Sequence, residues 1–135
     1  MTGLMGPDAV GAFCRALDGR DVGALAARLD DASVLHVPGS SGLSGDYQGR
    51  EAIVGLLQRM AAVTDGTLRF EVRRSLAPHS GALRIEGWLT GTRQGRPLGA
   101  TISVDVSLTG QALRSITIGC ADRSQWDAMW GRAPR

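Results

Sequence analysis

Residues 33–63, SVLHVPGSSGLSGDYQGREAIVGLLQRMAAV, decide the fold because the hydrophobic period changes along them from two residues to 3.6. The apolar and β-branched run 33–37 predicts a short strand, and Pro38-Gly39 ends it because proline cannot donate to a strand ladder. A Gly/Ser-rich loop follows. Residues 50–63 then predict a helix with one apolar stripe, formed by Ile53, Leu56, Leu57, Met60 and Val63. A strand, a loop and a covering helix together predict the wall of a pocket.

The rest of the chain predicts two helices before this stretch and a sheet after it. The apolar spacing in 7–19 and 21–29 is helical, and Asp21 is expected to cap the second helix. Four alternating runs predict strands that short turns connect into an antiparallel meander: 67–76, 82–93, 97–108 and 113–121. A short helix is expected at 123–131. This order predicts an α+β fold with a curved antiparallel sheet folded over the helices.

Length and charge limit the classes of protein to consider. The 135 residues suffice for one domain with its own core, and we expect a single domain over 1–135. The net charge is +2, and the 15 positive residues, all arginines, are spread along the chain. Because nucleic-acid binding needs a clustered basic stripe, we expect no nucleic-acid partner.

From the amino terminus and the cysteines we expect a reduced, cytoplasmic protein. The sequence MTGLMGPDAV lacks the features of a signal peptide, and no apolar run approaches the length of a membrane span. We therefore expect no membrane partner. Cys14 and Cys120 are far apart and lack the spacing of metal ligands, so we predict neither a metal site nor a disulfide.

Three motifs resemble the SnoaL-like branch of the nuclear transport factor 2-like superfamily. They are HVPG at 36–39, GDYQGREAI at 45–53, and the closing pattern that contains Asp122, Trp126, Asp127 and Trp130. The resemblance implies a cone in which a bent sheet and three helices enclose a deep apolar cavity. It also implies a homodimer that pairs through the outer face of the sheet, and acid–base chemistry without a cofactor. Relatives include polyketide cyclases, ketosteroid isomerases and limonene-epoxide-hydrolase-type enzymes, whereas others only bind ligands or act as scaffolds.

His36 and Asp122 are the two candidate catalytic residues. An ungapped comparison with ketosteroid isomerases places His36 where those enzymes have their aspartate base, and an imidazole can move a proton near neutral pH. Asp122 matches the catalytic aspartate of SnoaL-like cyclases. Strand alternation would place it beside apolar residues, and both side chains are then expected to project into an apolar hollow. The alternatives are a strand histidine bonded to a backbone carbonyl and an aspartate that caps the last helix.

Four more residues are candidates for substrate binding. Tyr47, in the loop beside the expected mouth, either donates to a substrate carbonyl or anchors the loop. Trp88 and Glu86 share one strand face, which either lines the cavity or forms a dimer surface, and parity alone leaves both possibilities open. Met60 belongs to the apolar stripe of the covering helix.

Two expected groupings of related enzymes are missing. Ketosteroid isomerases hold the oxyanion with a tyrosine on the first helix, where this chain has Phe13 and Cys14. Their donor aspartic acid would lie near Val104, where there is no acid. The Asp-Arg-Asp grouping of the epoxide hydrolases is not evident either.

The sequence therefore favours a cofactor-independent enzyme of the cyclase, isomerase or dehydratase type. Its expected substrate is a hydrophobic, carbonyl-bearing small molecule such as a polyketide intermediate. One alternative is a non-catalytic dimeric module that binds a small molecule or acts as a scaffold. The other is water addition as in epoxide hydrolases.

Overall fold

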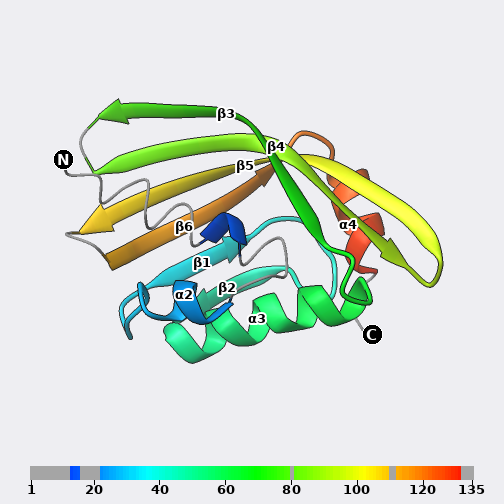
Figure 1. Cartoon of the computed structure of the whole chain (residues 1–135), viewed down its shortest axis with the longest axis horizontal. Helices are drawn as coiled ribbons and strands as arrows, with labels where there is room; N and C mark the ends of the chain where they lie inside the picture. The colour runs from blue at the N-terminus through cyan, green and yellow to red at the C-terminus, as the bar shows by residue number, and fades with distance from the viewer. Residues whose placement is uncertain (1–12, 16–21, 80, 110–111, 132–135) are drawn as a thin grey trace.

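A six-stranded sheet covers the helices in the computed structural model, which describes residues 13–15, 22–79, 81–109 and 112–131 (Figure 1). The helices are α2 (Val22–Ala26), α3 (Arg50–Val63) and α4 (Arg123–Trp130), and residues 13–15 are also helical. The strands are β1 (Val34–Val37), β2 (Gly45–Gln48), β3 (Arg69–His79), β4 (Ala82–Arg93), β5 (Arg96–Thr109) and β6 (Ala112–Cys120). The predicted α+β class with a curved sheet is confirmed.

Most predicted elements are present with small shifts at their ends. Strand β4 has the predicted bounds, whereas β3 continues through the expected turn until His79 pairs with Ala82. Helix α2 ends at Ala26, three residues before the predicted end. Most of the first predicted helix, and Asp21 with its predicted cap, lie outside the described residues.

The strand order of the sheet is β2-β1-β6-β5-β4-β3. Strands β3 to β6 form the predicted antiparallel meander. Strand β1 lies parallel to β6, so the sheet is not antiparallel throughout. Because the N-terminal half supplies β1, this pairing joins the two halves of the chain.

Strand β2 is the element that the sequence did not predict. Residues 45–48 were expected to be part of a loop, but they pair antiparallel with all four residues of β1. The register places Asp46 opposite His36 and Tyr47 opposite Leu35. The segment that was expected to be a loop therefore contains the tip and the second strand of a β-hairpin.

The sheet bends between β3 and β4. A register shift between Val72 and Arg74 marks a bulge, which increases the local twist. At the bend, a Cβ on Gly87 would collide with the carbonyl oxygen of Glu71 and lie 2.9 Å from a ring carbon of Phe70. A glycine is therefore required at this contact between the two strands.

The core lies between the sheet and the helices. The described part of the chain buries 24 hydrophobic residues in one continuous group that includes residues of every strand except β2. Helix α3 supplies Ile53, Leu56, Leu57 and Met60 from its predicted stripe, and α4 supplies Trp126, Met129 and Trp130. Helices α3 and α4 thus cover the inner face of the sheet. No described helix covers its outer face (Figure 1).

Candidate functional site

The inner side of the sheet is mostly apolar in the part of the chain that the structure describes. Its buried serines and threonine are hydrogen-bonded within the protein, whereas Nε of Arg93 and Nε1 of Trp130 are buried without a partner. The hydroxyl of Ser33 donates to the carbonyl of Leu113 at 2.6 Å, and that of Thr64 donates to the carbonyl of Met60 at 2.9 Å. Ser41 lies within 3.0 Å of the hydroxyl of Ser44. None of these groups is an acid or a base near neutral pH, so the described interior has no titratable catalytic group.

Trp130 contributes one polar atom that has no partner. Its side chain is only 6% exposed, and its Nε1–H has no hydrogen-bond acceptor among the residues that the structure describes. The neighbouring Trp126, in T-shaped contact with a centroid distance of 5.4 Å, instead donates its Nε1–H to the carbonyl of Pro38 at 2.9 Å. Because a buried unpaired donor costs about 1–3 kcal/mol, the indole of Trp130 would favour an acceptor from a bound molecule.

His36 lies on the outer face of the sheet. It alternates with Leu35 and Val37, which are 0% and 6% exposed and point into the core. Its Nδ1 is 2.7 Å from Oδ1 of Asp46, and the side chains are 42% and 74% exposed. The expectation that His36 projects into an apolar hollow is therefore wrong, although its proposed catalytic role is untested.

Asp46 is a residue that sequence reasoning missed. A carboxylate on Nδ1 favours the tautomer that carries its proton there, which leaves Nε2 as the acceptor. The sequence contains a signal for Asp46. Turn residues precede and follow residues 40–44, and Tyr47 comes after them. This pattern is compatible with a hairpin whose second strand returns along the first. Such a hairpin places an acid opposite His36.

Asp122 is the N-cap of α4. Its Oδ1 accepts the backbone N–H of Ser124 at 2.8 Å and that of Gln125 at 3.3 Å, and the residue is exposed. The predicted capping role is confirmed. Strand β6 ends at Cys120, so alternation does not extend to Asp122 and the expected apolar surroundings are absent. Its catalytic role stays a prediction.

Tyr47 and Met60 are tied into the fold. The phenol of Tyr47 donates to the carbonyl of Leu43 at 2.8 Å and receives Arg59 Nη2 at 3.3 Å. The guanidinium carbon of Arg59 also lies 5.6 Å from the centre of the Tyr47 ring. These contacts are those of a loop anchor. Met60 is 1% exposed and belongs to the core.

Glu86 and Trp88 lie on the outer face, which decides the question that parity left open. The alternate residues of β4, Ile85 and Leu89, are fully buried. Glu86 accepts Arg84 Nε at 3.1 Å and pairs with Arg74 Nε at 3.3 Å. The structure therefore brings neither Glu86 nor Trp88 to the apolar interior.

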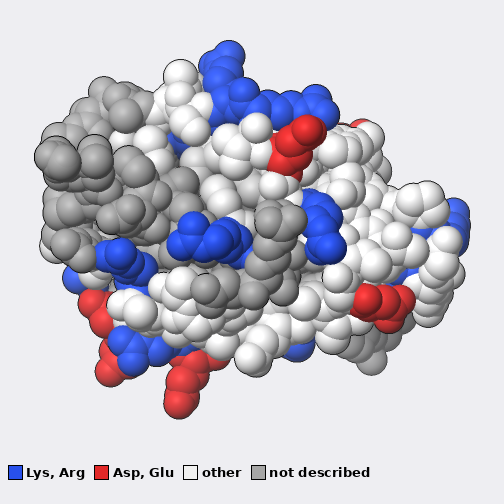
Figure 2. All heavy atoms as spheres, viewed as in Figure 1, with Lys and Arg blue, Asp and Glu red and all other residues white. Residues whose placement is uncertain are grey.

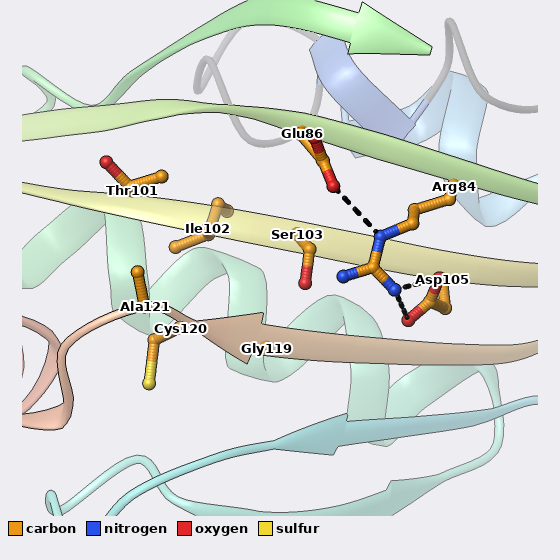
Figure 3. A pocket seen from close by; sticks show the side chains of 9 residues that line it. All are labelled: Arg84, Glu86, Thr101, Ile102, Ser103, Asp105, Gly119, Cys120 and Ala121. Atoms are coloured by element: carbon orange, nitrogen blue, oxygen red, sulfur yellow. Dashed lines mark hydrogen bonds and ion pairs between the residues drawn. The ribbon is translucent and has the colours of Figure 1, made fainter. Parts of the chain in front are cut away.

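A polar groove of about 560 Å³ crosses this outer face between β4, β5 and β6 (Figure 3). Arg84 lies in this groove between the carboxylates of Glu86 and Asp105. Its Nε donates to Glu86 at 3.1 Å, and its Nη1 is 3.2 Å from both carboxylate oxygens of Asp105. The hydrogen bond to Glu86 and the charge of Asp105 raise the pKa of Arg84. Asp105 and Arg84 are also opposite each other in register, in a row that continues through Thr117 to His36. His36 is two strands from Asp105, about 10 Å, so the two do not form one compact site.

Cys120 stands at one end of the groove (Figure 3). Partial burial raises the pKa of its thiol, with the charge of Arg123 acting in the opposite direction. The reactive thiolate is therefore scarce at neutral pH. A nucleophilic role for this cysteine is not supported.

The charged and metal-ligating side chains of the described residues are dispersed (Figure 2). On the face shown in Figure 2, arginines lie in separate groups with acidic residues between some of them. In the part of the chain that the structure describes, no group of three or more His, Cys, Asp and Glu side chains is arranged to hold a metal ion. Likewise, no helix among these residues is long and apolar enough to cross a membrane.

Comparisons with known proteins agree with the geometry of the fold. Residues 10–114 match the sequence profile of the SnoaL-like domain. Bal32a from a soil-derived mobile gene cassette is 24% identical, with 94% of this chain and 97% of that chain covered and a TM-score of 0.87. TerC, co-crystallised with polyporic acid, is 15% identical over 93% of this chain and 97% of that chain, with a TM-score of 0.79.

A candidate SnoaL-like polyketide cyclase from Shewanella denitrificans is 13% identical. It covers 94% of this chain and 97% of its own, with a TM-score of 0.75. No functionally curated protein matches this chain. At these identities the solved structures establish the fold, whereas the profile covers most of the chain. The protein thus belongs to the SnoaL-like domain family, whose nuclear transport factor 2-like fold is shared by polyketide cyclases and isomerases.

Proposed function

We propose that this protein binds a hydrophobic small molecule bearing a carbonyl or similar oxygen on the inner side of its sheet. The observation that carries the proposal is the unpaired Nε1–H of Trp130, one of two buried side-chain donors without a partner among the described residues, the other being Nε of Arg93. Ligand sites in proteins combine a mostly apolar lining with a few placed polar groups. One buried donor suits one acceptor oxygen.

The positions of His36 and Asp122 favour binding over catalysis. His36 faces outward and already contacts Asp46, and Asp122 is occupied by the backbone of α4. A ligand on the inner side would touch neither group. The co-crystallisation of TerC with polyporic acid supports a ligand-binding use of this fold.

Two variants with similar losses of volume test the role of the indole donor. Trp130→Phe removes the unpaired N–H, whereas Trp126→Phe removes one that Pro38 already accepts. The probe is Nile red, an apolar dye with a ring carbonyl, whose fluorescence shifts on binding. We expect Trp130→Phe to weaken binding about tenfold, the effect of one hydrogen bond of about 1.4 kcal/mol, and Trp126→Phe to leave it within about twofold.

Native mass spectrometry of the purified protein is the companion measurement. A co-purifying apolar compound with an oxygen acceptor is expected, and its retention should be reduced in Trp130→Phe. The proposal is wrong if the native protein neither carries such a compound nor binds Nile red. Equal weakening by the two variants would show that packing, and not the donor, controls binding.

The second candidate function is cofactor-independent acid–base catalysis of a cyclisation, isomerisation or dehydration. The observation that favours it is the 2.7 Å contact between His36 Nδ1 and Asp46 Oδ1, which orients the imidazole. Nε2 of His36 would take a proton from a carbon next to a carbonyl, and a single positioned base contributes about 10²- to 10⁴-fold. The substrate would then lie on the outer face.

Hydrogen exchange tests this candidate without knowledge of the product. The co-purified compound is incubated with catalytic amounts of protein in D₂O, and deuterium at carbon is followed by mass spectrometry. Catalysis by His36 predicts exchange that His36→Gln abolishes and Asp46→Asn reduces while binding persists. Exchange that is unaffected by both variants excludes His36 as the base.

We also propose that a second copy of the chain covers the row through Arg84 and Asp105. This row exposes both signs of charge, so two copies related by a two-fold axis can pair an acid with an arginine in each direction. Sedimentation equilibrium should show a dimer, and Arg84→Glu should dissociate it. A monomeric native protein contradicts this proposal.

A further inference from the structure

A second groove, next to the one around Arg84, lies on the outer face near the turn that joins β4 and β5. Its volume is about 440 Å³, within the range of small-ligand sites. Thr67, Trp88, Thr90, Thr92, Pro97 and Gly99 line it. Trp88 is four residues along β4 from Arg84, about 13 Å, and lies opposite Thr101, which lines the groove around Arg84, so the second groove lies beside the charged row.

Trp88 forms a flat platform at one side of this groove. A Cβ at position 99 would lie 2.5 Å from Cζ2 and 3.0 Å from Cε2 of the indole. The ring therefore occupies the space that only a glycine leaves open, and it lies against the backbone of β5. An indole packed in this way on one side can present its other side to a ligand.

The chemistry of the lining restricts what can stack there. The described lining residues carry no charge, and Thr90 and Thr92 add hydroxyl groups beside the ring. Thr67 belongs to the frame, because its Oγ1 accepts the N–H of Thr92 at 2.7 Å. An aromatic face next to neutral hydroxyls is complementary to a sugar ring, which has an apolar C–H face and a rim of hydroxyls.

We infer that this groove is a binding site for a neutral oligosaccharide. One pyranose ring stacks on Trp88, and its hydroxyls exchange hydrogen bonds with Thr90 and Thr92. An ionic ligand has no counter-charge in the described lining, and the open groove would leave much of an apolar ligand in water. This inference does not depend on the ligand proposed for the inner side.

The test is a titration of the ¹⁵N-labelled native protein with maltohexaose, cellohexaose or xylohexaose, followed by amide chemical shifts. We expect saturable shifts at Trp88, Thr90 and Gly99 with at least one of these sugars. Trp88→Ala should weaken that binding at least about tenfold, since it removes the stacking surface. Trp88→Phe should retain part of it.

Ser107→Ala, an exposed change elsewhere on the same face, is the matched control and should bind as the native protein does. Circular dichroism checks that each variant is folded. The inference is overturned if none of the three sugars gives saturable shifts or if Trp88→Ala binds normally. Equal binding of oligogalacturonate would also overturn it, because the site would then not select for neutral rings. A dimer that Trp88→Ala dissociates would assign the groove to a second copy of the chain.

Discussion

Removal of the Asp122 carboxylate should destabilise the protein by a predictable amount. The side chain accepts two backbone N–H groups at the start of α4, at 2.8 and 3.3 Å. Replacing such a cap by alanine costs about 1 kcal/mol. For a domain of this size, Asp122→Ala should then lower Tm by about 3–5 °C.

Asp122→Asn separates capping from charge. Asparagine caps helices about as well as aspartate, so this variant should stay within about 0.3 kcal/mol of the native protein. Ser124→Ala is the control, because it alters an exposed side chain in the same turn and keeps the backbone donor. Urea unfolding followed by tryptophan fluorescence measures all three, with Trp126 as a reporter inside the helix.

Two results would refute this reasoning. If Asp122→Ala is as stable as the native protein, the two contacts contribute nothing. If Asp122→Asn is as unstable as Asp122→Ala, the negative charge and not the cap is what matters. A stable Asp122→Asn that loses all turnover of an identified substrate would instead restore the catalytic hypothesis, since both roles can coexist.

Three further changes test the fold and the groove. Gly39→Ala should cost about 1–3 kcal/mol in the free energy of unfolding, because φ is 88° and a Cβ would collide with the carboxylate of Asp127. Gly66→Ala is its control, since φ is 75° but nothing lies within 4 Å, and an equal loss would rule out the collision. Leu56→Ala, at a fully buried position of α3, should cost about 2–5 kcal/mol in a urea titration, and a smaller loss would mean that the core collapses around the gap. Cys120 should be alkylated by iodoacetamide only at a higher pH than a free cysteine, because burial raises its pKa, and an alkylation profile like that of free cysteine would contradict this.

The regular parts of the fold were predictable because their periodicity is local. Every residue of α3 that the stripe predicted as buried is buried except Val63, which is partly so. Strand β2 was missed because a glycine and an aspartate among its four residues disfavour a strand, and only pairing with β1 overrides that preference. The parallel contact between β1 and β6 was equally invisible, since no local pattern encodes it.

The direction of His36 could have been predicted from its neighbours. Leu35 and Val37 flank it in a strand of period two, so burial of both places the histidine on the opposite face. The resemblance to ketosteroid isomerases led to the opposite interpretation. Alternation was the stronger argument, because turning His36 inward would expose two large apolar side chains.

This division of the sheet also supports the proposal that a ligand contacts Trp130 rather than the expected acids. A strand can present a charged group to solvent on its outer face at little cost, and His36, Glu86 and Asp105 all lie there. An unpaired donor in the core is different, because it destabilises the folded state until something accepts its proton. A phenylalanine at 130 would avoid that penalty, so the indole fits a site in which an acceptor is supplied by a bound molecule. Stability of the free protein and affinity for that molecule should therefore depend on Trp130 in opposite ways.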